Sequence, residues 1–291
     1  MRVTQQMMSQ QFIRNLHKNN QAMATTNAQI SSGKKYEKIS DNPQEVLKAL
    51  SHQSSIMKIE QYQKNAQDGA DVMQAIDDAL QGLTNVMHRI RELTVKGSND
   101  TANASDKKDI AQEIRSLQQQ VNNIANTTLG DRYLFSRTNY TAPPYSEGEW
   151  QTGQDALHWN IGQAVNVTVN VNADTVFGFP VDGKNLIDTI GSIAETLENG
   201  ENPNALLTSI DEQMENLLSQ NVIIGTNQNL LESAINKLDQ ASFLQTKMLS
   251  DAEDTNIAKA FTDLSLQEAA IQGSLQASGR MIQLSLVNFL R

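Results

Sequence analysis

The side chains that most often carry out enzyme chemistry are sparse in this chain and form no recognised catalytic pattern. The chain has no cysteine, so it has no thiol nucleophile, thiolate metal site or disulfide. The histidines show no His-x-x-x-His pair of the zinc-peptidase kind; they are His17, His52, His88 and His158. Glycine-rich phosphate-binding motifs and the Gly-x-Ser-x-Gly motif are also absent. We therefore expect no enzyme activity and no catalytic, cofactor-binding or metal-binding residues.

The remaining candidates for chemistry fit structural roles better. Asp77 and Asp78 form a carboxylate pair, but adjacent positions on a helix do not face each other, so we interpret the pair as solvated surface. His88 lies one position beyond an apolar seam and is interpreted as a surface or packing histidine. Met7 and Met8 are interpreted as flexible packing residues rather than metal ligands.

Composition excludes several classes of partner. The chain has 291 residues and a net charge of −10, which argues against binding a nucleic acid, because that affinity depends on neutralising phosphates. No apolar run approaches 18 residues, so no membrane-spanning helix and no membrane partner are expected. Residues 1–15 lack the apolar run of a cleaved signal peptide.

A heptad seam predicts one long helix near the N-terminal end. Its apolar and small residues follow at alternating steps of three and four; they are Ile59, Tyr62, Ala66, Gly69, Met73, Ile76, Leu80, Leu83, Met87 and Ile90. Pro43 suits a first helical position, preceded by the capping candidates Asp41 and Asn42, and Gly97 marks the end. A helix over 43–96 would be roughly 80 Å long.

The rest of the chain alternates between helical and extended patterns. A second seam over 110–124, closed by Gly130, predicts a helix that packs antiparallel to the first. Alternating valines from Val165 to Val171 predict a half-buried strand, and Asp182-Gly183 predicts a turn. The helical pattern resumes near Asn185 and is strong from Pro203 to Leu249.

Both ends of the chain predict apolar helices with few charges. The N-terminal stripe comprises Phe12, Leu16, Met23 and Ile30, and the C-terminal stripe comprises Leu264, Ile271, Leu275, Ile282 and Phe289. Residues 1–36 contain no acidic residue, and only Glu268 and Arg280 are charged between Leu264 and Leu290. We expect the two ends to pair within one molecule. Because two helices cannot cover each other completely, we also expect self-association, or disorder in the free monomer.

Together these patterns predict a mainly α fold: an elongated antiparallel helical coiled-coil rod, formed by the N- and C-terminal parts of the chain, with a small β-rich inserted domain. The predicted domains are a terminal helical assembly domain (1–42 and 251–291), a helical rod domain (43–137 and 184–250) and a β-rich variable insert (138–183).

Residues 31–45 predict a joint between the terminal helix and the rod. Gly33 ends the first helix, and Asp41, Asn42 and Pro43 restart the chain with a helix cap. The lysines between them fit a solvated surface; the alternative is pairing with acidic residues of the returning chain. The lysines are Lys34, Lys35 and Lys38, and the acidic candidates are Asp251, Glu253 and Asp254.

Two segments resemble the bacterial flagellin family. QISSGKKYEKISDNP (29–43) is similar to the segment that joins the terminal helix of flagellins and their junction relatives to the rod. EAAIQGSLQASGRMIQLSLVNFL (268–290) is similar to the family's C-terminal helix, and the resemblance covers about the first 137 and the last 90 residues. LGDRYLFSRTN (129–139) resembles an element of the hook–filament junction proteins, although Arg137 replaces a usual glycine.

The opening MRVTQQMM and the ending LSLVNFL also resemble junction proteins more than flagellin. A minor flagellin of the filament remains an alternative. A cytoplasmic coiled-coil scaffold is the alternative from a different class, and the charge-poor C-terminal residues argue against it.

The resemblance implies a structural subunit located outside the cell on the flagellum. It would be exported through the flagellar type III apparatus without a cleaved signal peptide, and it would form a ring with other copies of itself. Its other implied partners are another hook-associated protein, flagellin and a cytoplasmic export chaperone.

Overall fold

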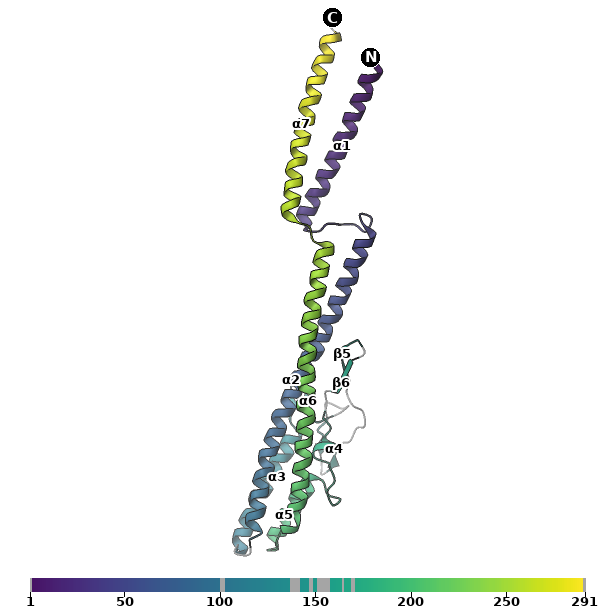
Figure 1. The fold of residues 1–291 in the computed structure, drawn as a ribbon. Coiled ribbons are helices and arrows are strands. Elements are labelled where there is room, and N and C mark those ends of the chain that lie inside the picture. Colours follow the sequence, from purple (N-terminus) through teal and green to yellow (C-terminus); the bar gives the residue numbers. More distant parts are fainter. Residues whose placement is uncertain are drawn as a thin grey trace. The chain divides into compact units, whose positions relative to one another are not determined.

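The computed structural model describes residues 2–99, 103–136, 142–146, 149–150, 158–163, 165–168 and 171–289. Seven helices and six short strands occur in this part of the chain (Figure 1). The helices are α1 (Arg2–Ser32), α2 (Pro43–Gly97), α3 (Ala104–Ala125), α4 (Ala173–Val176), α5 (Leu186–Glu198), α6 (Asn204–Glu253) and α7 (Ile257–Phe289). The strands are β1 (Thr128–Leu129), β2 (Arg132–Tyr133), β3 (Tyr145–Ser146), β4 (Glu149–Trp150), β5 (His158–Gly162) and β6 (Val165–Thr168). The predicted mainly α class with a small β-containing region is confirmed.

The chain divides into two compact units. The terminal unit comprises residues 1–58 and 241–291, and the central unit comprises residues 59–240. These divisions lie within α2 and α6, whereas the boundaries predicted from sequence lie at 42/43 and 250/251. The functional meaning of the predicted domains stays a prediction.

The heptad seam of α2 forms the core of the central unit. Most of its residues are completely buried, as the spacing predicted; they are Ala66, Met73, Ile76, Leu80, Leu83, Met87 and Ile90. The second predicted seam is also buried or half-buried, from Ile110 to Ile124 on α3. His88 and Asp78 lie exposed on α2 beside the seam, as expected for surface positions, whereas Asp77 is half-buried.

Helix α6 contributes a buried row at seven-residue spacing to the same core. Its members are Ile210, Leu217, Ile224 and Leu231. Gln63 of α2 donates a hydrogen bond to Asp239 of α6 over 2.6 Å, and Arg91 of α2 pairs with Asp211. Because the residue numbers rise on one helix as they fall on the other, α2 and α6 run antiparallel, as predicted.

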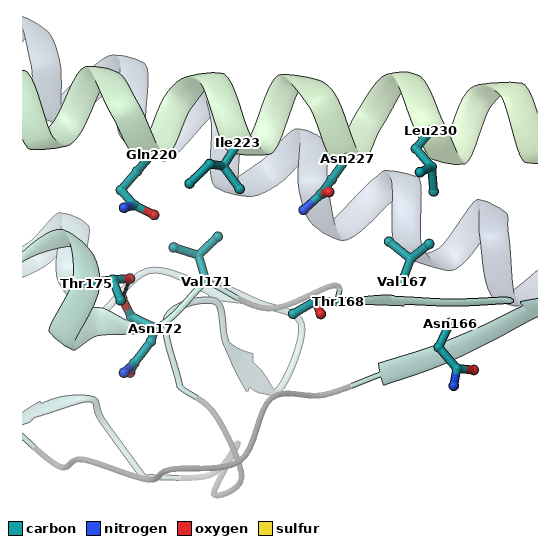
Figure 2. A pocket seen from close by; sticks show the side chains of 10 residues that line it. All are labelled: Asn166, Val167, Thr168, Val171, Asn172, Thr175, Gln220, Ile223, Asn227 and Leu230. Carbon is teal, nitrogen blue, oxygen red and sulfur yellow. Dashed lines mark hydrogen bonds between the residues drawn. The ribbon is translucent and has the colours of Figure 1, made fainter.

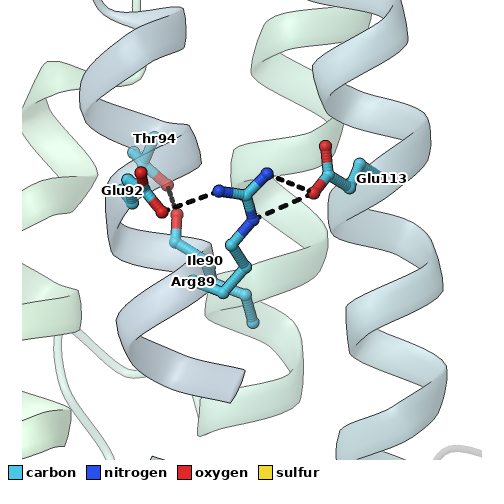
Figure 3. Close-up of polar contacts among 5 residues, drawn as sticks. All are labelled: Arg89, Ile90, Glu92, Thr94 and Glu113. Atoms are coloured by element: carbon cyan, nitrogen blue, oxygen red, sulfur yellow. Dashed lines mark hydrogen bonds and ion pairs between the residues drawn. The ribbon is translucent and has the colours of Figure 1, made fainter. Parts of the chain in front are cut away.

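Exposed ion pairs connect the outer edges of these helices. Arg89 of α2 contacts Glu92 on its own helix and Glu113 on α3, at 2.7 and 2.8 Å (Figure 3). Arg115 of α3 pairs with Glu198 of α5 over 2.6 Å and, by hydrogen bonding, lowers the pKa of that carboxyl. Exposed pairs of this kind add little free energy, so we interpret them as fixing helix register.

Helix α5 packs closely on the α2–α3 end of the core. Asn185 caps α5, since its side chain accepts a hydrogen bond from the Asp188 amide over 2.9 Å. A Cβ atom at Gly97 would lie only 2.6 Å from Leu197 Cδ2, so a side chain at this position would require the Leu197 side chain to move. The predicted turn before α5 is confirmed, because Asp182 and Gly183 both have positive φ and connect residues 181 and 184.

The short strands form three separate antiparallel hairpins, β1–β2, β3–β4 and β5–β6. An aromatic cluster includes Trp150 of β4: Phe177 lies edge-on to Phe135 at 5.1 Å and stacks on Trp150 at 5.4 Å. The predicted valine strand is present as β6, which ends at Thr168; Val169 lies outside the described residues, and Val171 is not in a strand.

The prediction that Gly130 closes the second helix was wrong. Helix α3 ends at Ala125, and Gly130, with φ of 63°, lies in the turn between β1 and β2. Glycine with positive φ serves a hairpin turn as well as a helix terminus, so the residue type alone does not distinguish the two.

Replacement of Leu80 by alanine tests the central core. Leu80 is fully buried, so Leu80→Ala should lower the free energy of unfolding by about 2–5 kcal/mol, measured by urea denaturation with circular dichroism. His88→Ala on the same helix removes an exposed side chain and should change stability by less than about 0.5 kcal/mol. An unchanged urea midpoint for Leu80→Ala would contradict the assigned core.

Candidate assembly surface

The terminal helices α1 and α7 lie side by side and antiparallel, with the two chain ends at the same end of the pair (Figure 1). Gln267 of α7 donates a hydrogen bond to Thr26 of α1 over 3.1 Å. Thr26 and Ala260 are buried between the helices. The pairing of the two ends within one molecule, expected from their apolar stripes, is present.

Each helix covers only part of the other. Six of the nine predicted assembly residues are therefore only half-buried: Phe12, Leu16, Met23, Ile30, Leu264 and Ile271. Leu275 is 51% exposed. Ile282 and Phe289 belong to α7, with Phe289 as its last residue, and their side chains lie outside the described part.

Other large apolar side chains on the same helices are exposed although they lie outside the predicted stripes. They include Met7, Ile13 and Leu266, the last of which is 63% exposed. Sequence reasoning missed them because it followed a single stripe per helix. The sequence did carry a signal for these exposed residues, because the other faces of both helices have few charged side chains. A helix exposed to water by itself would normally carry charged side chains on those faces.

The joint begins where Gly33 ends α1. Gly33 has φ of 73°, and its amide donates to Gln29 O over 2.9 Å, so the helix ends in the left-handed conformation that favours glycine. The space around Gly33 is open, since an added Cβ would meet no atom within 4 Å. Backbone conformation alone therefore explains the glycine.

The joint is paired with a second break in the returning chain. Lys34 and Asp254 form an antiparallel backbone bridge; the Lys35 amide donates to Glu253 O over 2.6 Å and the Thr255 amide donates to Gly33 O over 2.8 Å. This break separates α6 from α7. A domain boundary was predicted at 250/251, a few residues before this break, but its cap was not: Asn256 caps α7, with the Lys259 amide donating to Asn256 Oδ1 over 3.1 Å.

The lysines of the joint are not simply a solvated surface: the alternative, pairing with an acidic residue of the returning chain, holds for Lys34, whereas Lys35 contacts a backbone carbonyl. Lys34 forms an ion pair with Glu253, and Lys35 Nζ donates to the Asp251 carbonyl oxygen over 2.6 Å. Gln29 also donates to Lys35 O over 2.9 Å. Side-chain and backbone contacts thus tie together two segments that are more than 200 residues apart.

The predicted cap residues occupy the start of α2. Pro43 is its first residue, and Asn42 Oδ1 accepts from the Glu45 amide over 3.4 Å. Asp41 instead accepts from the Lys38 amide over 3.1 Å and closes a turn before the helix. Tyr36 lies against this turn, with its hydroxyl accepting from Asn42 Nδ2.

The described residues contain no group of three or more His, Asp or Glu side chains placed to hold a metal ion. Among the helices described, none combines the length and apolar character needed to cross a membrane. The notable feature of the terminal unit is therefore an apolar, charge-poor helical surface that the chain only half covers.

Comparison with known proteins shows what this chain is similar to. Residues 3–140 match the bacterial flagellin N-terminal helical region. The chain is similar to bacterial flagellins over these residues. It is 27% identical over 246 residues to the flagellar filament 31.3 kDa core protein of Treponema maltophilum, covering 84% of the chain and 83% of that protein.

Hook-associated proteins are similar over comparable or greater lengths. The flagellar hook-associated protein 3 of Escherichia coli is 23% identical over 313 residues and aligns with 98% of each chain. The crystal structure of flagellar hook-associated protein 3 from Legionella pneumophila shares the fold, with a TM-score of 0.63 at 16% identity, covering 69% of this chain and 97% of that one.

Two glycine-to-alanine substitutions test the joint. Gly33→Ala places a Cβ at positive φ and should cost about 1 kcal/mol, which should speed amide exchange at Lys35 and Thr255 roughly fivefold. Gly273→Ala is the matched control, because it lies in α7 with open space around it and should stabilise the helix slightly. Equal exchange in both variants would contradict the role of Gly33. Amide exchange followed by mass spectrometry makes the measurement.

Proposed function

We propose that this chain is a structural subunit of the bacterial flagellum, which joins the hook, through another hook-associated protein, to the flagellin filament. The observation that carries the proposal is the half-covered pair α1–α7, whose exposed apolar and uncharged side chains require further helices. Neighbouring copies and flagellin would supply those helices. The end-to-end alignment with hook-associated protein 3 supports the junction role.

The proposal includes the route by which the chain reaches this position. The chain would leave the cell through the flagellar type III export apparatus without a cleaved signal peptide and act outside the cell. A cytoplasmic export chaperone would cover the apolar face of α7 before export. The chain would have no enzymatic activity, in agreement with the sparse chemistry of its side chains.

A minor flagellin of the filament is the second candidate function. The similarity to the Treponema maltophilum filament core protein over 84% of the chain favours it. The relatives described above are flagellar proteins, which favours both flagellar functions over a cytoplasmic coiled-coil scaffold.

Electron microscopy of a deletion strain distinguishes the candidates. Loss of a junction subunit should leave hooks without filaments and release flagellin into the medium. Loss of a minor flagellin should leave filaments that lack only one segment. Normal flagella in the deletion strain would contradict both functions.

An acidic substitution on the exposed face of α7 tests the assembly surface. Leu275→Asp places a charge where a neighbouring helix would bury leucine, so the purified monomer should keep its melting temperature while filament attachment falls at least tenfold. Gln272→Asp is the matched control, because it adds the same charge at an exposed polar position of the same helix. Attachment is measured as the fraction of hooks that carry filaments. Full attachment with Leu275→Asp would exclude α7 from the contact.

A further inference from the structure

A groove in the central unit lies between α6 and the small β-containing region. One wall comes from β6, α4 and residues 171–172, and the other wall consists of four residues of α6: Gln220, Ile223, Asn227 and Leu230. Figure 2 shows these four side chains pointing from α6 toward Val167 and Val171, which point back toward the helix. The groove has a volume of about 450 Å³, which lies within the range of ligand-binding sites.

None of the described residues that line the groove is charged or aromatic. They are asparagine, glutamine, threonine, valine, isoleucine and leucine. A charged ligand would lose part of its hydration here without an opposite charge to compensate. A flat ligand such as a nucleobase would lack the aromatic surface on which it usually stacks. The groove therefore suits a neutral, non-aromatic ligand.

The absence of charge extends along the whole α6 wall. Residues 216–231 contain no lysine, arginine, aspartate or glutamate, although the chain as a whole has a net charge of −10. A helix surface exposed only to water would normally carry charged side chains. The electrostatic character of this wall is thus complementary to a neutral partner and not to a basic one.

The α6 wall presents groups whose chemistry is not used within the described part of the chain. Gln220 and Asn227 are half-buried, and neither side-chain amide has a hydrogen-bond partner among the described residues. Ile223 and Leu230 are 48% and 45% exposed. Free amides therefore alternate with exposed aliphatic side chains along the wall, and a ligand that combines amide and apolar groups would match both.

The spacing of the two amides fits an extended peptide. Gln220 and Asn227 are separated by two helical turns, which is about 10 Å along the helix axis. Three residues of an extended chain also span about 10 Å. Each side-chain amide both donates and accepts hydrogen bonds, so the pair would match two peptide units of one extended segment.

A neutral oligosaccharide is the other ligand class with suitable hydrogen-bonding groups, since hydroxyl groups also pair with amides. The aliphatic part of the lining favours the peptide. Val167, Val171, Ile223 and Leu230 would bury apolar surface against valine-like side chains, whereas a sugar presents hydroxyl groups around most of its ring.

We propose that this groove binds an extended, uncharged peptide segment of another protein. Gln220 and Asn227 would pair with its peptide units, and Ile223 and Leu230 would contact its aliphatic side chains. The wall from Gln220 to Leu230 is about 15 Å long, so it would hold about five extended residues. The site is separate from the terminal helices and does not depend on the flagellar role proposed above.

Fluorescence anisotropy with short peptides and the purified full-length chain tests the site. The probes are pentapeptides in which threonine alternates with valine, isoleucine or leucine, with blocked ends and an uncharged coumarin label. We expect saturable binding of at least one aliphatic probe. A probe with glutamate at the aliphatic positions should bind about tenfold more weakly or not at all, because no basic side chain lines the groove.

Asn227→Asp alters the chemistry of the groove while keeping its shape. The substitution adds an unpaired charge and removes the amide donor, so affinity for the aliphatic probe should fall about tenfold or more. Asn229→Asp is the matched control, because it makes the same change at an exposed position of α6 outside the groove, and affinity should stay within about twofold. Thermal melting followed by circular dichroism establishes that both variants remain folded.

Several results would overturn the inference: no saturable binding of any aliphatic probe, equal binding of the glutamate probe, or equal loss of affinity in the two variants. Displacement of the probe by the neutral sugar chitotriose would assign the groove to an oligosaccharide instead. A dimer that sedimentation detects and that Asn227→Asp abolishes would assign it to a second copy of the chain. Each of these results concerns the isolated chain and leaves the proposed function intact.

Discussion

A helix whose apolar residues are spread around its circumference needs several partners before it is covered. The structure depends on this constraint. In the central unit, α2 receives α3, α5 and α6 around one seam, and residues such as Met73 and Leu83 are excluded from water. In the terminal unit, α1 and α7 have only each other, and large apolar side chains remain exposed. The first arrangement buries its seam within the chain, whereas the second leaves apolar side chains that, under the proposed function, other molecules would cover.

The joint lies within the terminal unit, between the pair α1–α7 and the long helices α2 and α6. Both chain segments interrupt their helices there, one after Ser32 and the other after Glu253, and they are connected by backbone hydrogen bonds and the Lys34–Glu253 ion pair. A joint of this kind makes the pair α1–α7 separate from the long helices α2 and α6, although the chain connects them twice. Gly33 supplies the left-handed conformation that the first passage requires.

The helices could be predicted from the sequence because heptad spacing and helix capping depend on residues that are close together in the chain. The seam from Ala66 to Ile90 follows heptad spacing, and Asn185 precedes its helix in the usual capping position. Contacts between distant segments were harder to predict. The partner of Lys34 is 219 residues away in sequence, and the role of Gly130 as a hairpin turn depends on the pairing of β1 with β2.

Amide hydrogen exchange of the free chain and of isolated flagella tests most directly whether the terminal unit is completed by neighbours. In the free chain, the account predicts exchange within seconds for α1 and α7 and slow exchange for the buried turns of α2, α3, α5 and α6. In isolated flagella, protection of α1 and α7 should rise by at least a hundredfold. Equal protection of α1 and α7 in both states would show that the pair is already complete in one molecule and would contradict the account.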